Sequence, residues 1–143
     1  MTDSASLKPW KLCVLVIVLA LLPRAAIALQ PIPVQLDKML PDDAYYYFLT
    51  AENILTGAGP SVDGLNMSNG WHPLWMLVNL GIFALPTSDP NTPIYLILLL
   101  GALLDSLVAG LLFLGVRRFL GNGPALIGGG FYAINHMVIF QSV

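Results

Sequence analysis

Residues 92–116 read TPIYLILLLGALLDSLVAGLLFLGV, and Asp105 is the one charged side chain among them. This run is longer than the roughly 20 apolar residues that an α-helix needs to cross about 30 Å of hydrocarbon. Arg117 and Arg118 follow directly and end it. The stretch therefore predicts a membrane-spanning helix, and it decides the class of fold expected for the rest of the chain.

Two features inside this run indicate that the helix has neighbours. Ala102, Ser106 and Gly110 recur four residues apart, which makes a face of small side chains suited to close helix packing. A carboxylate near the middle of a span is costly unless it is paired. We expect Asp105 to pair with Asn79 or with helices that lie outside this chain.

The composition of the whole chain agrees with a membrane protein. Of its 143 residues, 57% are hydrophobic and only 10% are charged, whereas a soluble domain of this length needs a more polar surface. Five of the eight acidic residues fall between positions 37 and 63, where Lys38 is the only base. No clustered lysines and arginines mark a nucleic-acid-binding face, so a nucleic-acid partner is excluded.

Three further apolar runs are predicted to span the membrane, at about residues 12–29, 73–86 and 123–143. Lys8 and Lys11 precede the first run, which places the N-terminus in the cytoplasm and residues 30–72 in an outer loop. The alternative is a cleaved signal peptide with Ala26-Ile27-Ala28 as its cleavage site, and it puts the loop on the same side. The last residues are still apolar, so we expect the chain to be the N-terminal piece of a longer protein or a truncated gene product.

The outer loop contains one predicted helix, at residues 43–56. Apolar residues recur there at helical spacing, at Ala44, Phe48, Ala51 and Leu55. Glycines end it, and at about 13 residues it is too short to span a membrane. Its tyrosines favour the membrane interface, because each ring has an apolar body and a polar tip. Beyond it, residues 57–70 predict turns, with local hydrogen bonds from Asp63 and Asn69.

Asp42 and Asp43 stand at the start of this helix, and two interpretations are open. Carboxylates at a helix start cap free backbone N–H groups and complement the helix dipole. A carboxylate at the membrane surface can also remove a proton from a reacting hydroxyl as a general base. The pair by itself does not decide between these roles.

Residues 41–75 read PDDAYYYFLTAENILTGAGPSVDGLNMSNGWHPLW, and this segment resembles the first extracytoplasmic loop of the GT-C glycosyltransferases. That superfamily includes the protein O-mannosyltransferases and the lipid A aminoarabinose transferases. The parts occur in the family's order: an acidic pair, an amphipathic helix, a turn-rich segment, and a His-Pro entry into the next span. The resemblance implies an all-α polytopic transmembrane helix bundle with an extracytoplasmic loop carrying a short interfacial helix.

The resemblance also implies a reaction. A GT-C enzyme of this kind moves a sugar from a polyprenyl-phosphate donor to an acceptor hydroxyl at the outer membrane face, with inversion. By resemblance Asp42 is the catalytic base, and Asp43 orients the acceptor or positions Asp42. Arg24 and His72 would bind the leaving phosphate, and Tyr46 would contact the substrate. Relatives with monophosphate donors generally need no metal, so no cofactor is expected. Relatives with diphosphate donors bind one, and Asp42 or Asp43 would then be a metal ligand.

Each of these residues also has a structural interpretation. Arg24 can extend to the outer head groups, and His72 can act as an interfacial or capping residue. Tyr46 and its neighbours can anchor the helix among membrane lipids. The alternative function is a non-catalytic membrane subunit or scaffold, or a truncated inactive paralogue. In either case we expect an integral protein of a bacterial or archaeal plasma membrane.

Residues 73–86 leave two topologies open. If they cross the membrane, Arg117 and Arg118 lie outside, against the tendency of basic residues to stay in the cytoplasm. If they are re-entrant, both arginines lie inside and the number of spans changes. The crossing topology is preferred because the resemblance to the GT-C enzymes implies that the second span begins at this position.

Overall fold

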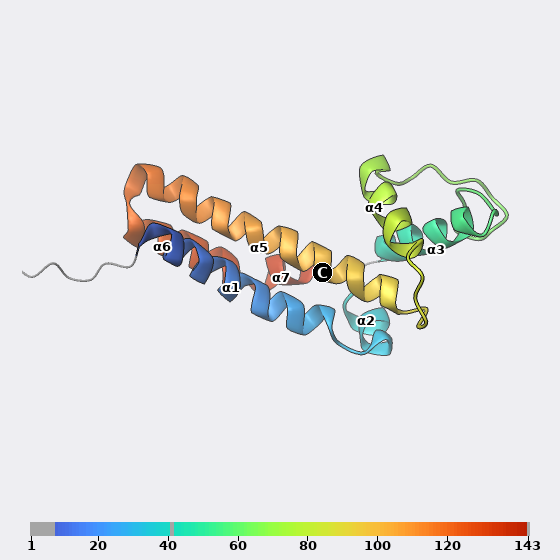
Figure 1. Ribbon diagram of the computed structural model, residues 1–143, viewed down its shortest axis with the longest axis horizontal. Helices are drawn as coiled ribbons and strands as arrows, with labels where there is room; N and C mark the ends of the chain where they lie inside the picture. The colour runs from blue at the N-terminus through green and yellow to red at the C-terminus, as the bar shows by residue number, and fades with distance from the viewer. Residues whose placement is uncertain (1–7, 41, 143) are drawn as a thin grey trace, which may run out of the picture. The chain divides into compact units, whose positions relative to one another are not determined.

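The computed structural model describes residues 8–40 and 42–142 (Figure 1). Within them the chain forms helices and no strand apart from an isolated bridge between Ser61 and Met67. The all-helical class of fold is therefore confirmed. The chain divides into two compact units: residues 30–98 form the loop unit, and residues up to 29 together with those from 99 onward form the span unit. The helices are α1 (Pro9–Ala28), α2 (Ile32–Lys38), α3 (Asp42–Leu55), α4 (Pro73–Phe83), α5 (Thr92–Leu120), α6 (Asn122–Ile134) and α7 (His136–Gln141).

Two described helices, α1 and α5, are long and apolar enough to cross a membrane. With 20 residues, α1 is about 30 Å long, which matches the hydrocarbon thickness. Of an apolar stretch of 18 residues in each helix, only 28% is buried inside the protein in α1 and 39% in α5. A core helix of a soluble protein would be mostly buried, whereas exposed apolar helix surface is what lipid covers. These two helices support membrane association.

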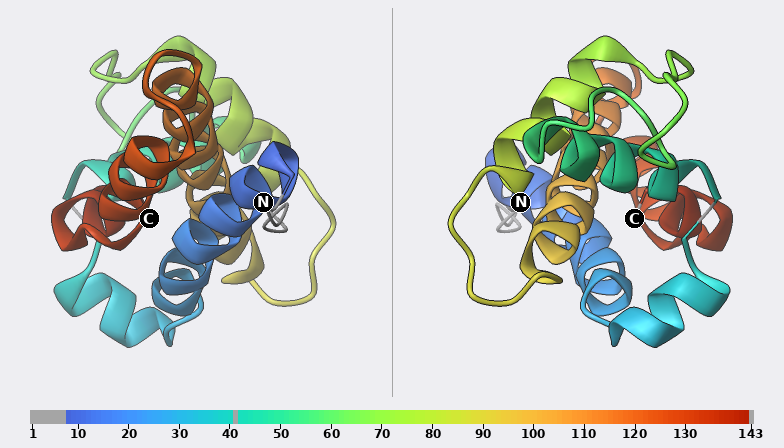
Figure 2. Two further views of the ribbon diagram at one scale, coloured as in Figure 1. Left: turned by 90° about the vertical axis from the view of Figure 1, so that its left-hand side faces the viewer. Right: turned by 90° about the vertical axis from the view of Figure 1, so that its right-hand side faces the viewer.

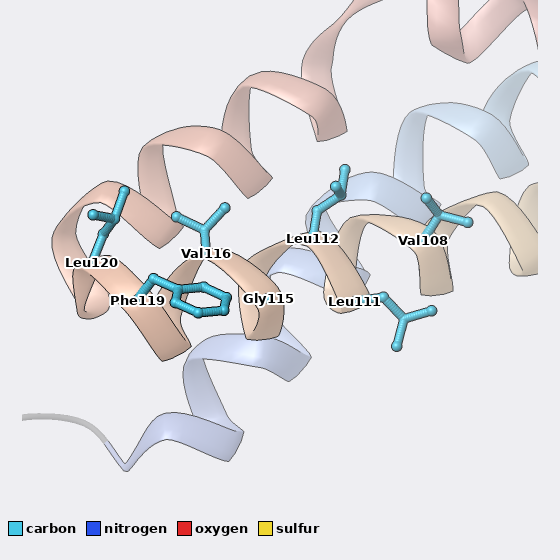
Figure 3. Close-up of a pocket in the computed structure, with 7 residues that line it drawn as sticks. All are labelled: Val108, Leu111, Leu112, Gly115, Val116, Phe119 and Leu120. Carbon is cyan, nitrogen blue, oxygen red and sulfur yellow. The ribbon is translucent and has the colours of Figure 1, made fainter.

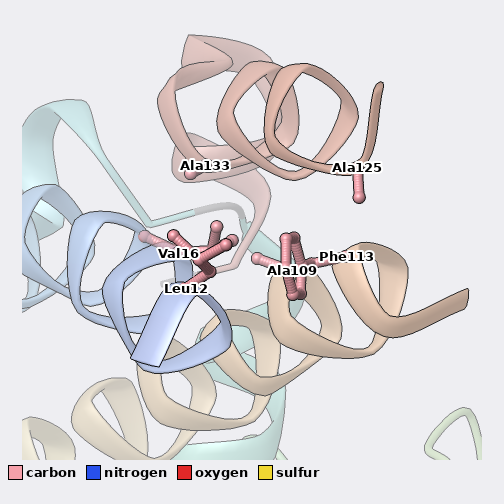
Figure 4. Packing of buried hydrophobic residues seen from close by; sticks show 7 residues of the cluster. Leu12, Val16, Ala109, Phe113, Ala125 and Ala133 are labelled. Carbon is pink, nitrogen blue, oxygen red and sulfur yellow. The ribbon is translucent and has the colours of Figure 1, made fainter. Parts of the chain in front are cut away.

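The span unit is held together by α1, α5 and α6. Its core combines large and very small side chains from all three helices: Leu12, Val16, Ala20, Ala109, Phe113, Ala125 and Ala133. Figure 4 shows Leu12 and Val16 of α1 beside Ala109 and Phe113 of α5. The views in Figure 2 show α6 beside α1. A side chain at Gly129 would lie 3.0 Å from Val16, so this glycine lets α6 approach α1 closely.

Helices α1 and α5 are antiparallel neighbours. The Cys13 thiol lies 3.8 Å from the carbonyl oxygen of Gly110, and further along α1 the side chain of Arg24 reaches Asp105. A Cβ atom at Gly110 would lie 2.7 Å from the side chain of Ile17. Gly110 is therefore the point where the two helices need a residue without a side chain, as the spacing of small residues predicted.

The run at residues 123–143 was predicted as one span, but it folds as two helices, α6 and α7. Asn135 separates them with an extended ψ of 114°. Its side-chain oxygen accepts hydrogen bonds from the backbone N–H groups of Met137 (3.0 Å) and Val138 (3.5 Å). The asparagine thus caps the start of α7, and this local bonding competes with continuation of α6.

In the loop unit, α3 packs against α4. The predicted helix at residues 43–56 is confirmed as α3, which begins one residue earlier and ends one residue earlier. The rings of Phe48 on α3 and Phe83 on α4 lie 6.0 Å apart. With 11 residues, α4 is about 16 Å long, roughly half of the hydrocarbon thickness. A membrane crossing by residues 73–86 remains a prediction.

Candidate functional site

The first turn of α3 carries the two predicted catalytic acids. Asp42 begins the helix, and its side chain lies outside the described part of the structure. The side chain of Asp43 is described and is exposed. A carboxylate at this position can reach a substrate or solvent without displacing any part of the core.

A hydrogen bond brings His72 to the same helix. The backbone N–H of His72 donates to the hydroxyl of Tyr47 at 2.8 Å. Tyr47 lies four residues after Asp43 and therefore on the same face of α3, one turn further along. His72 itself is exposed and precedes α4, and its side chain makes no capping hydrogen bond to that helix. The tether therefore holds the start of α4 beside the first turns of α3.

The three consecutive tyrosines of α3 have different surroundings. Tyr46 is 51% exposed, whereas the ring of Tyr45 packs edge-on against Phe48 at 6.4 Å. Tyr47 is half-buried and makes the tether to His72. Of the three tyrosines only Tyr46 is exposed. Both of its predicted roles, substrate contact and lipid anchoring, stay predictions.

The turn segment after α3 is organised by Asp63. One carboxylate oxygen accepts hydrogen bonds from the Ser61 hydroxyl (2.9 Å) and from the backbone N–H groups of Leu65 (2.9 Å) and Asn66 (2.7 Å). The other oxygen accepts one from the Asn66 side chain at 2.7 Å. These bonds, those from Asn66 above all, hold the pKa of Asp63 well below its usual range. The local hydrogen bonds predicted for Asp63 are confirmed.

This turn segment is also tied back to α3. The side-chain amide of Asn53 donates to the carbonyl oxygens of Ser61 (2.9 Å) and Val62 (3.2 Å). Further along, the indole N–H of Trp71 donates to the carbonyl oxygen of Ser68 at 3.1 Å. Side chains thus donate hydrogen bonds to backbone carbonyl groups that lie outside the helices. These hydrogen bonds connect the turn segment to α3 and to the residues before α4.

A cavity of about 470 Å³ lies in the loop unit along another face of α3. It is bounded by that helix, by Phe83 at the end of α4, and by residues around the start of α5. Among the described residues that line it, Glu52 is the only charged one. Asp43, Tyr46 and His72 do not line it, so this cavity and the predicted catalytic face are separate features.

Arg24, predicted to bind the donor phosphate or to extend to head groups, is fully buried in the span unit. Its Nε donates to a carboxylate oxygen of Asp105 at 2.7 Å, and its Nη2 lies 2.6 Å from the same oxygen. The Tyr132 hydroxyl donates to the other oxygen of Asp105 at 2.6 Å. Asp105 thus finds its partners on α1 and α6. The extended conformation predicted for Arg24 is wrong, and this pairing does not favour a phosphate contact.

Arg24 also donates a hydrogen bond to the last turn of α6. Its Nη1 donates to the carbonyl oxygens of Ala20 (2.8 Å) and Ala133 (2.9 Å). The last carbonyls of a helix have no partner within the helix, and in hydrocarbon no water replaces one. A cation there also complements the negative end of the helix dipole. The break after α6 is therefore stabilised from α1 by one guanidinium group.

Neither Tyr132 nor the tether from Tyr47 was predicted from the sequence. The ion pair could have been predicted, because Arg24 and Asp105 are the only residues among the Asp, Glu, Lys and Arg of the sequence that fall within the four predicted apolar runs, and their charges are opposite. Within the described residues, no group of three or more His, Cys, Asp or Glu side chains could hold a metal ion. Comparison of the chain with protein-family models, curated proteins and solved structures found no match.

Proposed function

We propose that the chain is part of a membrane glycosyltransferase. It moves a sugar from a polyprenyl-phosphate donor to an acceptor hydroxyl at the outer membrane face. The observation that supports this function best is the 2.8 Å hydrogen bond between Tyr47 and the backbone of His72. It ties the residue proposed for the donor phosphate to the helix that begins with the proposed base, across 25 residues of sequence.

In the proposed reaction, Asp42 removes the proton of the acceptor hydroxyl. The resulting oxygen attacks the anomeric carbon of the sugar from the face opposite the lipid phosphate. The carbon–oxygen bond to the phosphate breaks, and its electron pair leaves with the phosphate. Configuration at the anomeric carbon is therefore inverted, and the proton stays on the carboxyl group until solvent removes it.

The other residues of the loop have supporting roles in this proposal. Asp43, exposed on the same turn, orients the acceptor or positions Asp42. The side chain of His72 stabilises the charge that develops on the leaving phosphate. Tyr46, with half of its surface exposed, contacts the sugar or the adjacent lipid. Arg24 is left out of the phosphate site because its guanidinium is occupied by Asp105.

The test is sugar transfer in membranes that contain the protein, with radiolabelled polyprenyl-phosphate sugars as donors. Asp42→Asn is expected to abolish transfer to any acceptor, while insertion and expression stay unchanged. Asp37→Asn is the matched control, since it removes an exposed carboxylate of the same loop unit that has no proposed role. Transfer by Asp42→Asn at the rate of the unmodified protein would reject Asp42 as the base.

A second candidate, a non-catalytic membrane subunit, is favoured by one observation. The only arginine within α1 serves the packing of the span unit, through Asp105 and the end of α6. The same assay separates the candidates. A scaffold transfers no label from any donor, and both aspartate variants then behave alike.

A further inference from the structure

Four basic residues gather at one end of the span unit. Lys8 and Lys11 stand at the start of α1, and Arg117 and Arg118 in the last turn of α5. Since α1 and α5 are antiparallel, these helix ends lie on the same side (Figure 1). Within the described residues of the span unit the only acid is Asp105, which pairs with Arg24. We call these four residues the basic end, and among the described residues of the span unit no carboxylate other than that of Asp105 accompanies them.

Aromatic side chains mark the same end as a membrane interface. Trp10 is 61% exposed and Phe119 is 80% exposed. The Lys11 ammonium group lies 5.7 Å from the centre of the Trp10 ring. Tryptophan mixed with lysine and arginine is typical of the level at which lipid head groups meet hydrocarbon. The basic end is therefore placed where charged lipid head groups lie.

An apolar groove on α5 leads away from the arginines. Its volume is about 490 Å³, and Figure 3 shows its lining residues, all from α5: Val108, Leu111, Leu112, Gly115, Val116, Phe119 and Leu120. A Cβ atom at Gly115 would meet no other atom within 4 Å, so the missing side chain leaves the groove open. From Val108 to Leu120 the groove follows about 18 Å of helix, close to the roughly 15 Å of one leaflet.

We propose that the basic end binds an anionic phospholipid of the cytoplasmic leaflet. The lipid phosphate lies at Arg118 and Arg117, and one acyl chain follows the groove past Gly115. Charge complementarity identifies this occupant, because four cations lie beside an apolar groove, and the only acid among the described residues of the span unit is paired with Arg24. The Arg117 Nε donates to Asn122 at 2.9 Å, which fixes its guanidinium, while Arg118 is exposed. This inference does not depend on the proposed enzymatic function.

The test uses tryptophan quenching by brominated lipids in vesicles. Replacing Trp71 and Trp75 by phenylalanine leaves Trp10, which stands at the basic end, as the only reporter. Brominated phosphatidylglycerol and brominated phosphatidylcholine are compared, and the ratio of their association constants is the readout. We expect a ratio well above about fivefold in favour of phosphatidylglycerol, because more than one basic residue contributes, and this ratio should fall as the salt concentration rises.

Arg118→Gln is expected to lower this ratio about fivefold, since one basic residue near an anionic surface contributes about that factor. Lys38→Gln, which removes one charge from the loop unit, is the matched control and should leave the ratio unchanged. Gly115→Leu should weaken quenching by both lipids and leave their ratio as it was.

Three results would overturn the proposal. The first is an unchanged ratio in Arg118→Gln, and the second is an equal fall in Lys38→Gln. The third is quenching that rises as the protein is diluted in lipid, because a second copy of the chain would then cover the groove. Unchanged quenching in Gly115→Leu would reject the acyl-chain part of the proposal.

Discussion

At the scale of single residues, Arg24 makes hydrogen bonds to groups on α1, α5 and α6. A fully buried guanidinium is costly, and it is tolerated here because Asp105 neutralises it and two carbonyl oxygens accept its hydrogen bonds. Tyr132 completes the arrangement by donating to Asp105 and by placing its ring 5.8 Å from the guanidinium. One side chain thus joins α1, α5 and α6.

Asp105→Ala is expected to destabilise the span unit by about 3–5 kcal/mol, because it leaves Arg24 buried and unpaired. Tyr132→Phe removes one hydrogen bond and should cost about 1 kcal/mol. The measurement is reversible unfolding in detergent micelles, followed by circular dichroism. The double variant Arg24→Met with Asp105→Leu should recover most of the loss. Equal destabilisation by the single and double variants would contradict the pairing.

Asp63 predicts a pH dependence of the turn segment. Folding lowers its pKa below the ordinary value of 3.8, so the ionised carboxylate stabilises the turn fully above about pH 4. This contribution is lost as the pH falls through the folded-state pKa. The amide resonances of Leu65 and Asn66, followed by NMR from about pH 5 into strongly acidic solution, should shift only well below the ordinary pKa. Asp63→Asn should show no such step, and a step at the ordinary pKa would contradict the network.

At the scale of helices, glycines decide where two helices approach and where a surface stays open. Gly110 lies where a side chain would collide with Ile17, and Gly115 lies where it would meet nothing. Both glycines interrupt the same apolar run, so sequence spacing alone does not separate their roles. The difference comes from α1, whose Ile17 faces Gly110, whereas no atom faces Gly115 within 4 Å.

Gly110→Leu is therefore expected to destabilise the span unit by about 1–3 kcal/mol, through overpacking against α1. Gly115→Leu should leave the stability equal or slightly higher, because it removes a flexible residue from a helix without a collision. Unfolding in the same micelles compares the two variants directly. Equal effects of both substitutions would show that α1 does not pack at Gly110.

At the scale of the whole molecule, the basic end bears on the membrane topology. Basic residues at the start of α1 and the end of α5 point to one cytoplasmic side for both. If α1 leads out and α5 leads back, the chain between them starts and ends outside, and α4, with its 11 residues, makes no net crossing. The arrangement thus favours the re-entrant alternative for residues 73–86 over the crossing topology preferred from sequence.

This topology is tested at Ser88, an exposed residue between α4 and α5. In a background of Cys13→Ala, which removes the only natural thiol, Ser88→Cys should react with a membrane-impermeant maleimide added outside intact cells. Gly123→Cys, just beyond the end of α5, is the cytoplasmic control and should react only after the membrane is opened. Protection of the thiol at position 88 in intact cells would instead support the crossing topology.

The sequence by itself determined the helical class, the two long apolar helices, α3 with its flanking glycines, and the hydrogen bonds of Asp63. These features depend on local composition and periodicity, which are fully present in the chain. The tertiary structure decided the partners of Asp105, the tether between Tyr47 and His72, and the gathering of Lys8, Lys11, Arg117 and Arg118. Each of these joins residues that are distant in the sequence, and the packing of helices, not local propensity, fixes which of them meet.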